Sequence, residues 1–396
     1  MESAMKKIKL LYDIEQLLMS AGRETGICRV SLEVLKRISK QKEYEVYPIV
    51  TTKKGVDPVK YLEDKGLGYL VPNIVRMPYL KKTTQKYNLY KKAYCYFLTQ
   101  KYFHEYMKQL RQYDEYLSLF SPISPIIYKS QIKTRMFIHD LIPLIMPETC
   151  SPGFVKKYRS WIKQVKADEV ICVSDATKID FFKFRPDYIN KNTKVVYLAA
   201  DSKFKPSKSN AIKEKYHIPT QKYFLAVSDH NPRKNFIHIL NSFVKFLNQI
   251  EAKDISLVFA GPKGRHYEKL QEKIQNYPEY ANKIICTGFV ADSDMPALYS
   301  EATAFLYPSL YEGFGLPVLE AMQCGTPVIT CHNSSLPEVG GDVALYVPET
   351  DAKKMAHVMG DLYSNPSKRQ ELSLKGLQRA QQFTWDKTTQ QIFDLK

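Results

Sequence analysis

The sequence predicts an α/β protein made of two doubly wound, Rossmann-like parallel-sheet domains that face each other across a cleft. Three observations support this fold class. Short β-rich runs alternate with helical stretches, which is the pattern of βα units. A polar, lysine-rich segment broken by prolines, residues 201–222, divides these units into two series. The length of 396 residues is sufficient for two hydrophobic cores.

The first series opens with strands expected at 8–13 and 43–51, and the intervening RVSLEVLKRISK has helical spacing. Further β-rich runs end near residues 140, 174 and 199. The second series places strands at 223–228, 255–261, 283–288, 303–309, 327–330 and 344–347. Because ligands bind beyond the carboxyl ends of parallel strands, motifs that follow these strands are expected to line the cleft.

Composition narrows the class of protein. Apolar residues make up 44% of the chain, as in ordinary globular proteins. The apolar runs are too short to span a bilayer, and Asp13 and Glu15 interrupt any signal-peptide core, so we expect a cytoplasmic protein. Seven scattered cysteines argue against a zinc site or a disulfide framework. The net charge of +17 indicates an anionic partner.

The stretch LYEGFGLPVLEAMQCGTPVI, residues 310–329, carries the most specific pattern. A strand leads into a loop with two glycines, and a helix of about two turns follows, with Pro317 at its first position. The backbone amides of Phe314, Gly315 and Leu316 are therefore expected at the positive end of a helix, where they favour an anion such as phosphate. Glu320 in the first turn is suited to a ribose diol.

Other candidates follow other strands. Glu312 lies on the same loop, nearer to whatever the phosphate carries, and Arg233 and Lys234 follow the first strand of the second series. That pair is equally compatible with a solvated surface. His139 ends a strand and precedes Asp140, which is expected to orient its ring; a core or capping histidine is the alternative.

The triplet DSD at 292–294 resembles a metal-binding motif, but we assign no metal to it. Asp292 or Ser293 is expected instead to cap the helix that MPALYSEA predicts.

The string PSLYEGFGLPVLEAMQCGTPVI, followed by SSLPEVGGDVALYV, resembles the signature of family-4 retaining glycosyltransferases of the GT-B fold. TGFVADSDMPALY, SDHNPRKNF, FIHDLIPLIMPE and ETGICRVSLEVL resemble further segments of that family, so the resemblance covers most of the chain. It implies an acceptor-binding domain at 1–205, a nucleotide-sugar-binding domain at 217–375, and a last helix at 376–396 that packs back on the first domain.

The resemblance also implies roles. Glu320 would hold the donor ribose, and Glu312 would contact the donor sugar. Arg233 and Lys234 would neutralise the diphosphate leaving group. The remaining implied positions are the amides of Phe314, Gly315 and Leu316 on sugar hydroxyls or phosphate, the backbone of Val290 at the base, His139 beside the transferred sugar, and Gly26 near the phosphates or the acceptor.

The function implied is retaining, metal-independent transfer of a hexose from a nucleotide-diphosphate sugar, with no cofactor. The acceptor would be a glycan or lipid-linked molecule of surface polysaccharide, lipopolysaccharide or glycolipid synthesis. GDP-mannose is the first expected donor, because HDLIP resembles a segment of mannosyltransferases. An epimerase acting on a nucleotide-sugar with the same two-lobed scaffold is the alternative, and a binding protein without activity is a third.

Residues 76–111 contain nine lysines or arginines, nine tyrosines or phenylalanines and one acidic residue, Glu105. Lysines with interfacial aromatic rings are typical of segments that dock on anionic membranes. One hypothesis is therefore a peripheral contact with the inner face of the cell membrane; a lysine-rich helical pair with inward tyrosines is the alternative. No nucleic-acid-binding motif is present, so no nucleic-acid partner is expected.

Overall fold

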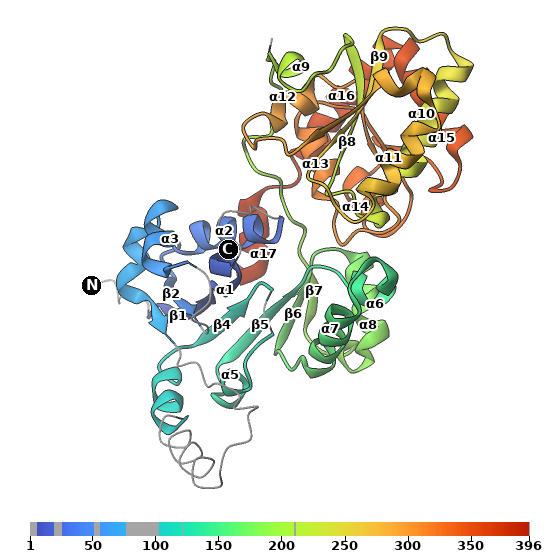
Figure 1. Ribbon diagram of the computed structural model, residues 1–396. Coiled ribbons are helices and arrows are strands. Elements are labelled where there is room, and N and C mark those ends of the chain that lie inside the picture. Colours follow the sequence, from blue (N-terminus) through green and yellow to red (C-terminus); the bar gives the residue numbers. More distant parts are fainter. Residues whose placement is uncertain are drawn as a thin grey trace.

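The computed structural model describes residues 6–19, 26–50, 56–76, 103–120, 122–209 and 211–395. These residues form two lobes, each built on one parallel sheet (Figure 1). Together the two sheets confirm the predicted fold class.

The first sheet has the strand order β3-β2-β1-β4-β5-β6-β7. Its strands are β1 (Ile8–Asp13), β2 (Tyr44–Val50), β3 (Val75–Arg76), β4 (Glu115–Ser118), β5 (Lys133–Ile138), β6 (Glu169–Cys172) and β7 (Thr193–Val195). Its helices are α1 (Glu15–Met19), α2 (Gly26–Ile38), α3 (Pro58–Asp64), α5 (Pro125–Lys129), α6 (Ile142–Ile145), α7 (Pro152–Gln164) and α8 (Asp175–Phe184), with short 3-10 turns η1 (Gly68–Asn73), η2 (Pro147–Thr149) and η3 (Pro186–Tyr188).

The second sheet has the order β10-β9-β8-β11-β12-β13. Its strands are β8 (Lys222–Val227), β9 (Ile255–Ala260), β10 (Ile284–Gly288), β11 (Ala304–Tyr307), β12 (Val328–Thr330) and β13 (Leu345–Tyr346). Its helices are α9 (Ile212–Lys215), α10 (Phe236–Gln249), α11 (Tyr267–Gln275), α12 (Met295–Ser300), α13 (Leu316–Gln323), α14 (Leu336–Gly340), α15 (Ala352–Ser364) and α16 (Pro366–Ala380), with 3-10 turns η4 (Pro232–Lys234) and η5 (Pro278–Lys283).

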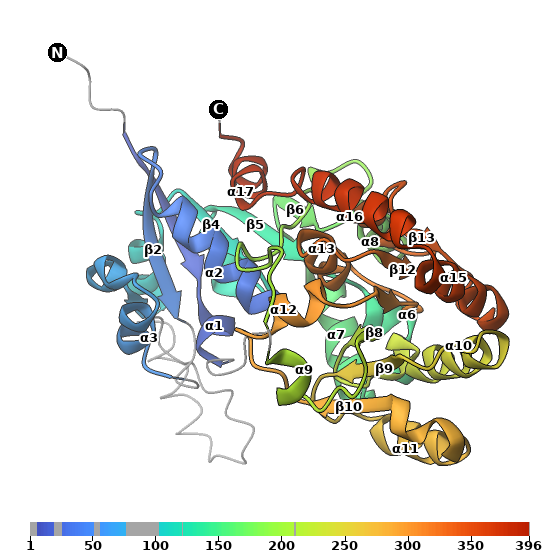
Figure 2. The ribbon, with the colours of Figure 1, turned by 90° about the horizontal axis from the view of Figure 1, so that it is seen from above.

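Both sheets are doubly wound, because the strand order reverses beside β1 in the first and beside β8 in the second. The central strands β8 and β9 read KYFLAV and ISLVFA, the continuous apolar runs that a strand covered on both faces requires. Helices α10 and α15 pack side by side over one face of the second sheet (Figure 2).

The sequence reading missed β4, a short central strand of the first sheet. Its first residue, Glu115, is buried, and a buried carboxylate is atypical of a central strand. The structure compensates this charge, because Arg135 Nη1 lies 2.5 Å from a Glu115 oxygen. Arg135 Nε also lies 2.6 Å from Glu169, so the arginine on β5 joins the adjacent strands β4 and β6.

The last helix, α17 (Trp385–Phe393), lies beside α2 of the first lobe (Figure 1). Trp385 is buried, the rings of Phe393 and Tyr44 are 5.1 Å apart, and the Thr388 hydroxyl donates to the carbonyl of Tyr197 at 2.8 Å. The chain thus crosses between the lobes twice, and the second crossing fastens its C-terminal end to the lobe where it began.

Candidate active site

The loop after β11 leads into α13 through a backbone conformation that only glycine adopts easily. Gly315 has φ 102° and forms the N-cap of α13. A Cβ at Gly315 would lie 3.1 Å from Leu336 Cδ2, so the loop also packs closely against α14. Among the described residues, none accepts a hydrogen bond from the amides of Phe314, Gly315 or Leu316. These groups form the positive end of α13.

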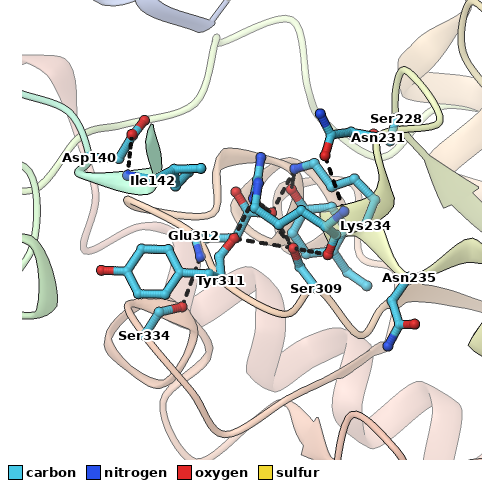
Figure 3. Close-up of polar contacts among 12 residues, drawn as sticks. Asp140, Ile142, Ser228, Asn231, Lys234, Asn235, Ser309, Tyr311, Glu312 and Ser334 are labelled. Carbon is cyan, nitrogen blue, oxygen red and sulfur yellow. Dashed lines mark hydrogen bonds and ion pairs between the residues drawn. The ribbon is translucent and has the colours of Figure 1, made fainter. Parts of the chain in front are cut away.

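Two cations from the turn after β8 meet one carboxylate from the loop after β11. Arg233 Nη1 and Lys234 Nζ lie 2.5 and 2.6 Å from the same oxygen of Glu312 (Figure 3). Asn231 caps the turn by accepting from the Arg233 amide at 3.1 Å. Arg233 and Glu312 side chains are only 13% and 9% exposed. The sequence separation of about 80 residues is closed because β8 and β11 are neighbours in the sheet.

The loop residue Glu312 is fixed from several sides. The Ser309 hydroxyl donates to the same Glu312 oxygen at 2.5 Å. The Glu312 amide donates to Ser334 Oγ at 2.9 Å, and the Ser335 hydroxyl donates to the Glu312 carbonyl at 3.0 Å. The carboxylate is therefore held in one orientation by groups of its own lobe.

The electrostatics of this cluster leave one positive charge in excess. Burial alone would raise the pKa of Glu312, but Arg233 and Lys234 outweigh burial and lower it to about 2. Burial, and next the neighbouring Arg233, lower the pKa of Lys234 to about 8 despite its carboxylate partner. Two cations that share one carboxylate oxygen in a buried site are suited to stabilise a further anion.

The two lobes touch at the glycine loop. A Cβ at Gly313 would lie 2.1 Å from the carbonyl oxygen of His139 and 2.8 Å from Asp140 Cβ, so only glycine allows this approach. The Gly313 carbonyl accepts hydrogen bonds from the hydroxyls of Ser174 and Thr177 at 2.7 and 3.1 Å. Both donors belong to the first lobe, at the N-terminal end of α8.

His139 and Asp140 directly follow β5, on the first-lobe side of the contact. His139 Nε2 lies 2.6 Å from the carbonyl oxygen of Leu119, and burial lowers the pKa of this histidine to about 4. The expectation that Asp140 orients the His139 ring is wrong, because Asp140 Oδ1 accepts from the Ile142 amide at 2.9 Å (Figure 3). Leu119 holds the ring instead.

Asp140 is a functional candidate that the sequence reading did not include. Burial raises the pKa of its carboxyl, and the nearby Arg233 opposes that rise. Asp140 is thus close enough to Arg233 to feel its charge, although its carboxylate is turned toward the Ile142 amide, as Figure 3 shows. Its place directly after a strand, next to the histidine, is the signal that could have identified it.

Glu320 lies on α13 and is paired across the lobes. Arg29 Nη1 from α2 lies 3.0 Å from Glu320 Oε1, and the Tyr299 hydroxyl donates to Oε2 at 3.2 Å. Arg29 also contacts both oxygens of Asp292, at 3.2 and 3.1 Å. Burial raises the pKa of Glu320, and Arg29 opposes this effect.

The expected helix cap at 292–293 is wrong. The N-cap of α12 is Asp294, which makes no side-chain capping bond. Asp292 pairs with Arg29 and Lys203 instead, because the two cations outcompete neutral amides for its carboxylate. Arg29 itself was missed, because a single arginine in a predicted amphipathic helix has no local feature that distinguishes it from a surface residue.

The remaining candidates occupy different positions. Gly26 begins α2, and a Cβ there would lie 3.2 Å from Leu316 Cδ1, so Gly26 lies at the mouth of α13. Phe314 is buried, and its ring lies 6.0 Å from that of Tyr197, so only its backbone amide remains a candidate for ligand binding. Val290 is buried and follows β10.

Residues 77–102, which carry most of the basic aromatic segment, lie outside the described residues. Within the described part of the chain, no helix is long and apolar enough to cross a membrane. No group of three or more His, Cys, Asp or Glu residues there has the arrangement of a metal site.

Residues 208–379 match the family model described as glycosyl transferases group 1. The chain is 28% identical over 382 residues to the O-antigen chain mannosyltransferase B of Escherichia coli, and the alignment covers 93% of this chain and 95% of that protein. It is also 28% identical over 264 residues to the serotype-specific mannosyltransferase WbdA of Escherichia coli, but this alignment covers 65% of this chain and 32% of WbdA.

Solved structures share the two-lobed arrangement. Anabaena HepE in complex with UDP superposes with a TM-score of 0.71 at 18% identity, covering 98% of this chain and 99% of that one. WaaG, a glycosyltransferase involved in lipopolysaccharide biosynthesis, gives a TM-score of 0.65 at 13% identity, covering 98% and 99%. The family match makes residues 208–379 similar to the group 1 glycosyltransferases, in agreement with the resemblance found in the sequence. The structural matches over the whole chain show that it has the GT-B fold.

Proposed function

We propose that this enzyme transfers a hexose, with mannose as the first candidate, from a nucleotide-diphosphate sugar to a glycan or lipid-linked acceptor in cell-surface polysaccharide synthesis. The mannosyltransferase names of several relatives support this choice of sugar and pathway class. GDP-mannose is accordingly the first donor to test, followed by UDP- and dTDP-sugars. No observation favours the epimerase alternative.

The observation that carries the proposal is the excess charge beside the mouth of α13. Arg233 and Lys234 share one oxygen of Glu312, and the amides of Phe314 and Gly315 have no partner among the described residues. A diphosphate would supply the missing negative charge and the missing acceptors. All of these residues belong to the second lobe, so the diphosphate of the donor would bind mainly to that lobe.

The same groups suit the chemistry of transfer. When the anomeric C–O bond breaks, negative charge grows on the leaving phosphate oxygen, and two preorganised cations with helix-end amides stabilise it. The proposal uses the chain's own cations for this task and assigns no metal or cofactor. Glu312 would orient hydroxyls of the sugar while positive charge develops at the anomeric carbon, and Glu320 would accept from the ribose diol.

The first lobe would supply the acceptor side. His139 and Asp140 lie against Gly313 of the glycine loop, and Figure 3 shows Asp140 on the opposite side of Glu312 from Lys234. The lowered pKa of His139 leaves its ring neutral at pH 7, so it is suited to hydrogen bonding with sugar hydroxyls rather than to charge stabilisation. Retention of anomeric configuration would follow the front-face route, in which the leaving phosphate accepts the acceptor's proton.

The test is a transfer assay with radiolabelled GDP-mannose, UDP-glucose and dTDP-sugars against a lipid extract and a glycan pool. Movement of label into either fraction supports the proposal. Conversion of the sugar without transfer would support the epimerase, and binding without reaction would contradict enzymatic activity. Glu320→Ala should mainly weaken donor binding, whereas Glu312→Ala and Lys234→Ala should lower turnover; full turnover in Lys234→Ala would remove Lys234 from the mechanism.

A contact with the inner face of the cell membrane remains part of this proposal. The net charge of +17 supports it. Sedimentation with vesicles of anionic phospholipid at low salt tests the contact, and no binding there would contradict it.

A further inference from the structure

A groove with a volume of about 830 Å³ runs between α5 and α7 of the first lobe, away from the cation cluster. One stripe of α7 forms one wall, since Gly153, Lys156, Lys157, Ser160, Trp161 and Gln164 recur at helical spacing. This stripe extends for about 16 Å at 1.5 Å per residue. The volume lies within the range of small-molecule binding sites.

The charge of this groove has one sign. Lys129 lines it from α5, Lys156 and Lys157 line it from α7, and Lys166 follows α7. None of the described residues that line the groove is acidic, and none of the four lysines forms an ion pair with any described residue. Helix α7 as a whole carries four basic residues and no acidic residue. Lys129 Nζ lies 5.4 Å from the centre of the Phe103 ring. Four lysines around one hollow, without an acidic partner among the described residues, favour an anionic ligand.

Part of the lining of the groove is apolar. Pro122 and Ile123 precede α5, Pro125 is its first residue, Trp161 lies on α7 and Val165 follows α7. A lining that combines apolar residues with lysines is suited to a ligand that carries phosphate on a hydrocarbon chain, because the lysine heads can meet phosphate oxygens while the chain covers the apolar residues.

The groove is connected to the candidate transfer site by a short series of ring contacts. The ring of Trp161 lies 6.2 Å from that of Phe120, which lies 6.4 Å from that of His139. Tyr158, whose ring is 4.8 Å from that of Trp161, donates its hydroxyl to the carbonyl of Asp140 at 2.6 Å. One layer of side chains thus separates the groove from the residues expected beside the transferred sugar.

We propose that the groove between α5 and α7 binds the phosphate-bearing apolar anchor of the acceptor. The inference rests on the proposed function, because it assigns this groove to the acceptor of the same transfer reaction. The acceptor class it names is a sugar joined through phosphate or diphosphate to a hydrocarbon chain. Lys129 and Lys157 would bind the phosphate from opposite walls.

The binding test needs no sugar transfer, because Trp161 is one of only two tryptophans and the other, Trp385, is the buried first residue of α17. The fluorescence of Trp385→Phe therefore reports on the groove, and Trp161→Phe serves as the signal control. The probes are octyl phosphate, octyl glucoside and inorganic phosphate, each below the concentration at which micelles form. We expect a saturable change with octyl phosphate that is absent in Trp161→Phe.

Two variants then distinguish binding in the groove from non-specific attraction to the positive charge of the protein. Lys129→Gln combined with Lys157→Gln should weaken octyl phosphate binding about tenfold, the effect of two lost ion pairs. Lys163→Gln, which removes an exposed lysine of the same helix outside the groove, should leave it unchanged. Equal weakening in both variants would overturn the proposal.

The remaining outcomes show which part of the ligand the groove recognises. An equal response to octyl glucoside would overturn the role of phosphate, and an equal response to inorganic phosphate would overturn the role of the chain. Absence of any response with intact sugar transfer would reject the groove while leaving the proposed function standing. A response in a protein that transfers no sugar to any acceptor would instead retain the site and contradict the function.

Discussion

Arg29 of the first lobe lies 3.0 Å from Glu320 of the second, and this pair joins α2 to the helix that carries the expected ribose carboxylate. The Tyr299 hydroxyl holds the other oxygen at 3.2 Å. Both Glu320 oxygens are therefore oriented, each with a lone pair that remains available to a diol. Donor recognition in the second lobe is thereby linked to the position of the first.

Arg29→Gln should raise the donor KM about tenfold, because a buried carboxylate loses its charged partner and its orientation. The pKa of Glu320 is already raised by burial, and Arg29 opposes that rise, so the substitution should raise it further. Donor binding depends on the ionised form, which is present above this pKa and lost as the pH falls through it. The acidic limit of donor binding should therefore move to higher pH.

Steady-state kinetics as a function of pH measure this shift. Arg29→Lys should recover part of the affinity, and Lys36→Gln, on the same helix, is the matched control. An unchanged pH profile of donor KM in Arg29→Gln would contradict a role for Arg29 in holding Glu320.

The order of strands and helices, and the elements that carry Glu312 and Glu320, could be predicted from sequence because apolar runs, glycines and helix caps are local signals. The sequence predicts that Arg233, Lys234 and Glu312 lie near one another, but it does not predict that they form ion pairs. The sequence reading expected all three to face the ligand, whereas the structure has both cations on one carboxylate oxygen. That geometry depends on strand order, which local patterns do not encode.

The contacts between the lobes could not be predicted from the sequence for the same reason. Asp292 was expected at a helix cap, where its nearest neighbours in sequence are amides. Its actual partner Arg29 lies 263 positions away in sequence. The segment 201–222 was read as a linker, and the short helix α9 (Ile212–Lys215) within it is too brief to show a period.

Gly313→Ala should abolish most transfer while leaving the protein folded. The new Cβ would lie 2.1 Å from the His139 carbonyl oxygen, and relief requires the lobes to separate because that oxygen belongs to the other lobe. A displacement of this size at the reacting groups is expected to cost about 100-fold in kcat. The hydrophobic cores of the two sheets are untouched, so the melting temperature should change little.

The matched control for this prediction is Gly68→Ala, where the nearest atom to the new Cβ is Glu63 Cγ at an ordinary 3.6 Å. Transfer rates and thermal melts of the two variants give the comparison. Wild-type turnover in Gly313→Ala would show that the close contact with His139 is dispensable.

Lys234 should impose an alkaline limit on activity. Burial and the adjacent Arg233 lower its pKa to about 8, so the ammonium charge is present below that pH and is lost above it. Because kcat/KM for the donor reports the free enzyme, it should fall as the pH rises beyond about 8. Lys234→Arg should remove this limit, since the guanidinium stays charged, even where the rate itself is lower.

The pH profiles of kcat/KM for wild type, Lys234→Arg and the exposed-site control Lys353→Arg decide the assignment. Tyr307, which contacts Lys234, has a pKa raised well above its ordinary value by burial and so does not titrate in this range. An alkaline limit that persists in Lys234→Arg would assign the titration to another group.

Glu338 should hold the lobes in their closed arrangement. It lies on α14 of the second lobe, yet its two oxygens accept hydrogen bonds from the amides of Asp175 and Ala176 at 2.8 and 2.9 Å. These amides begin α8 of the first lobe, so a carboxylate from one lobe caps a helix of the other and interacts favourably with its dipole. Ser174, the N-cap of α8, and Thr177 in its first turn donate to the Gly313 carbonyl.

Glu338→Gln should loosen this cap, because an amide offers one acceptor oxygen where the carboxylate offers two. Turnover should fall about tenfold, the effect of one lost charged cap across an interface. Small-angle scattering should show a larger mean radius, whereas the affinity of the second lobe for a free nucleoside diphosphate should stay unchanged. Glu371→Gln, which breaks an exposed pair with Lys375, is the control. A fall in turnover without any change in radius would place the effect of Glu338 in the chemistry rather than in lobe closure.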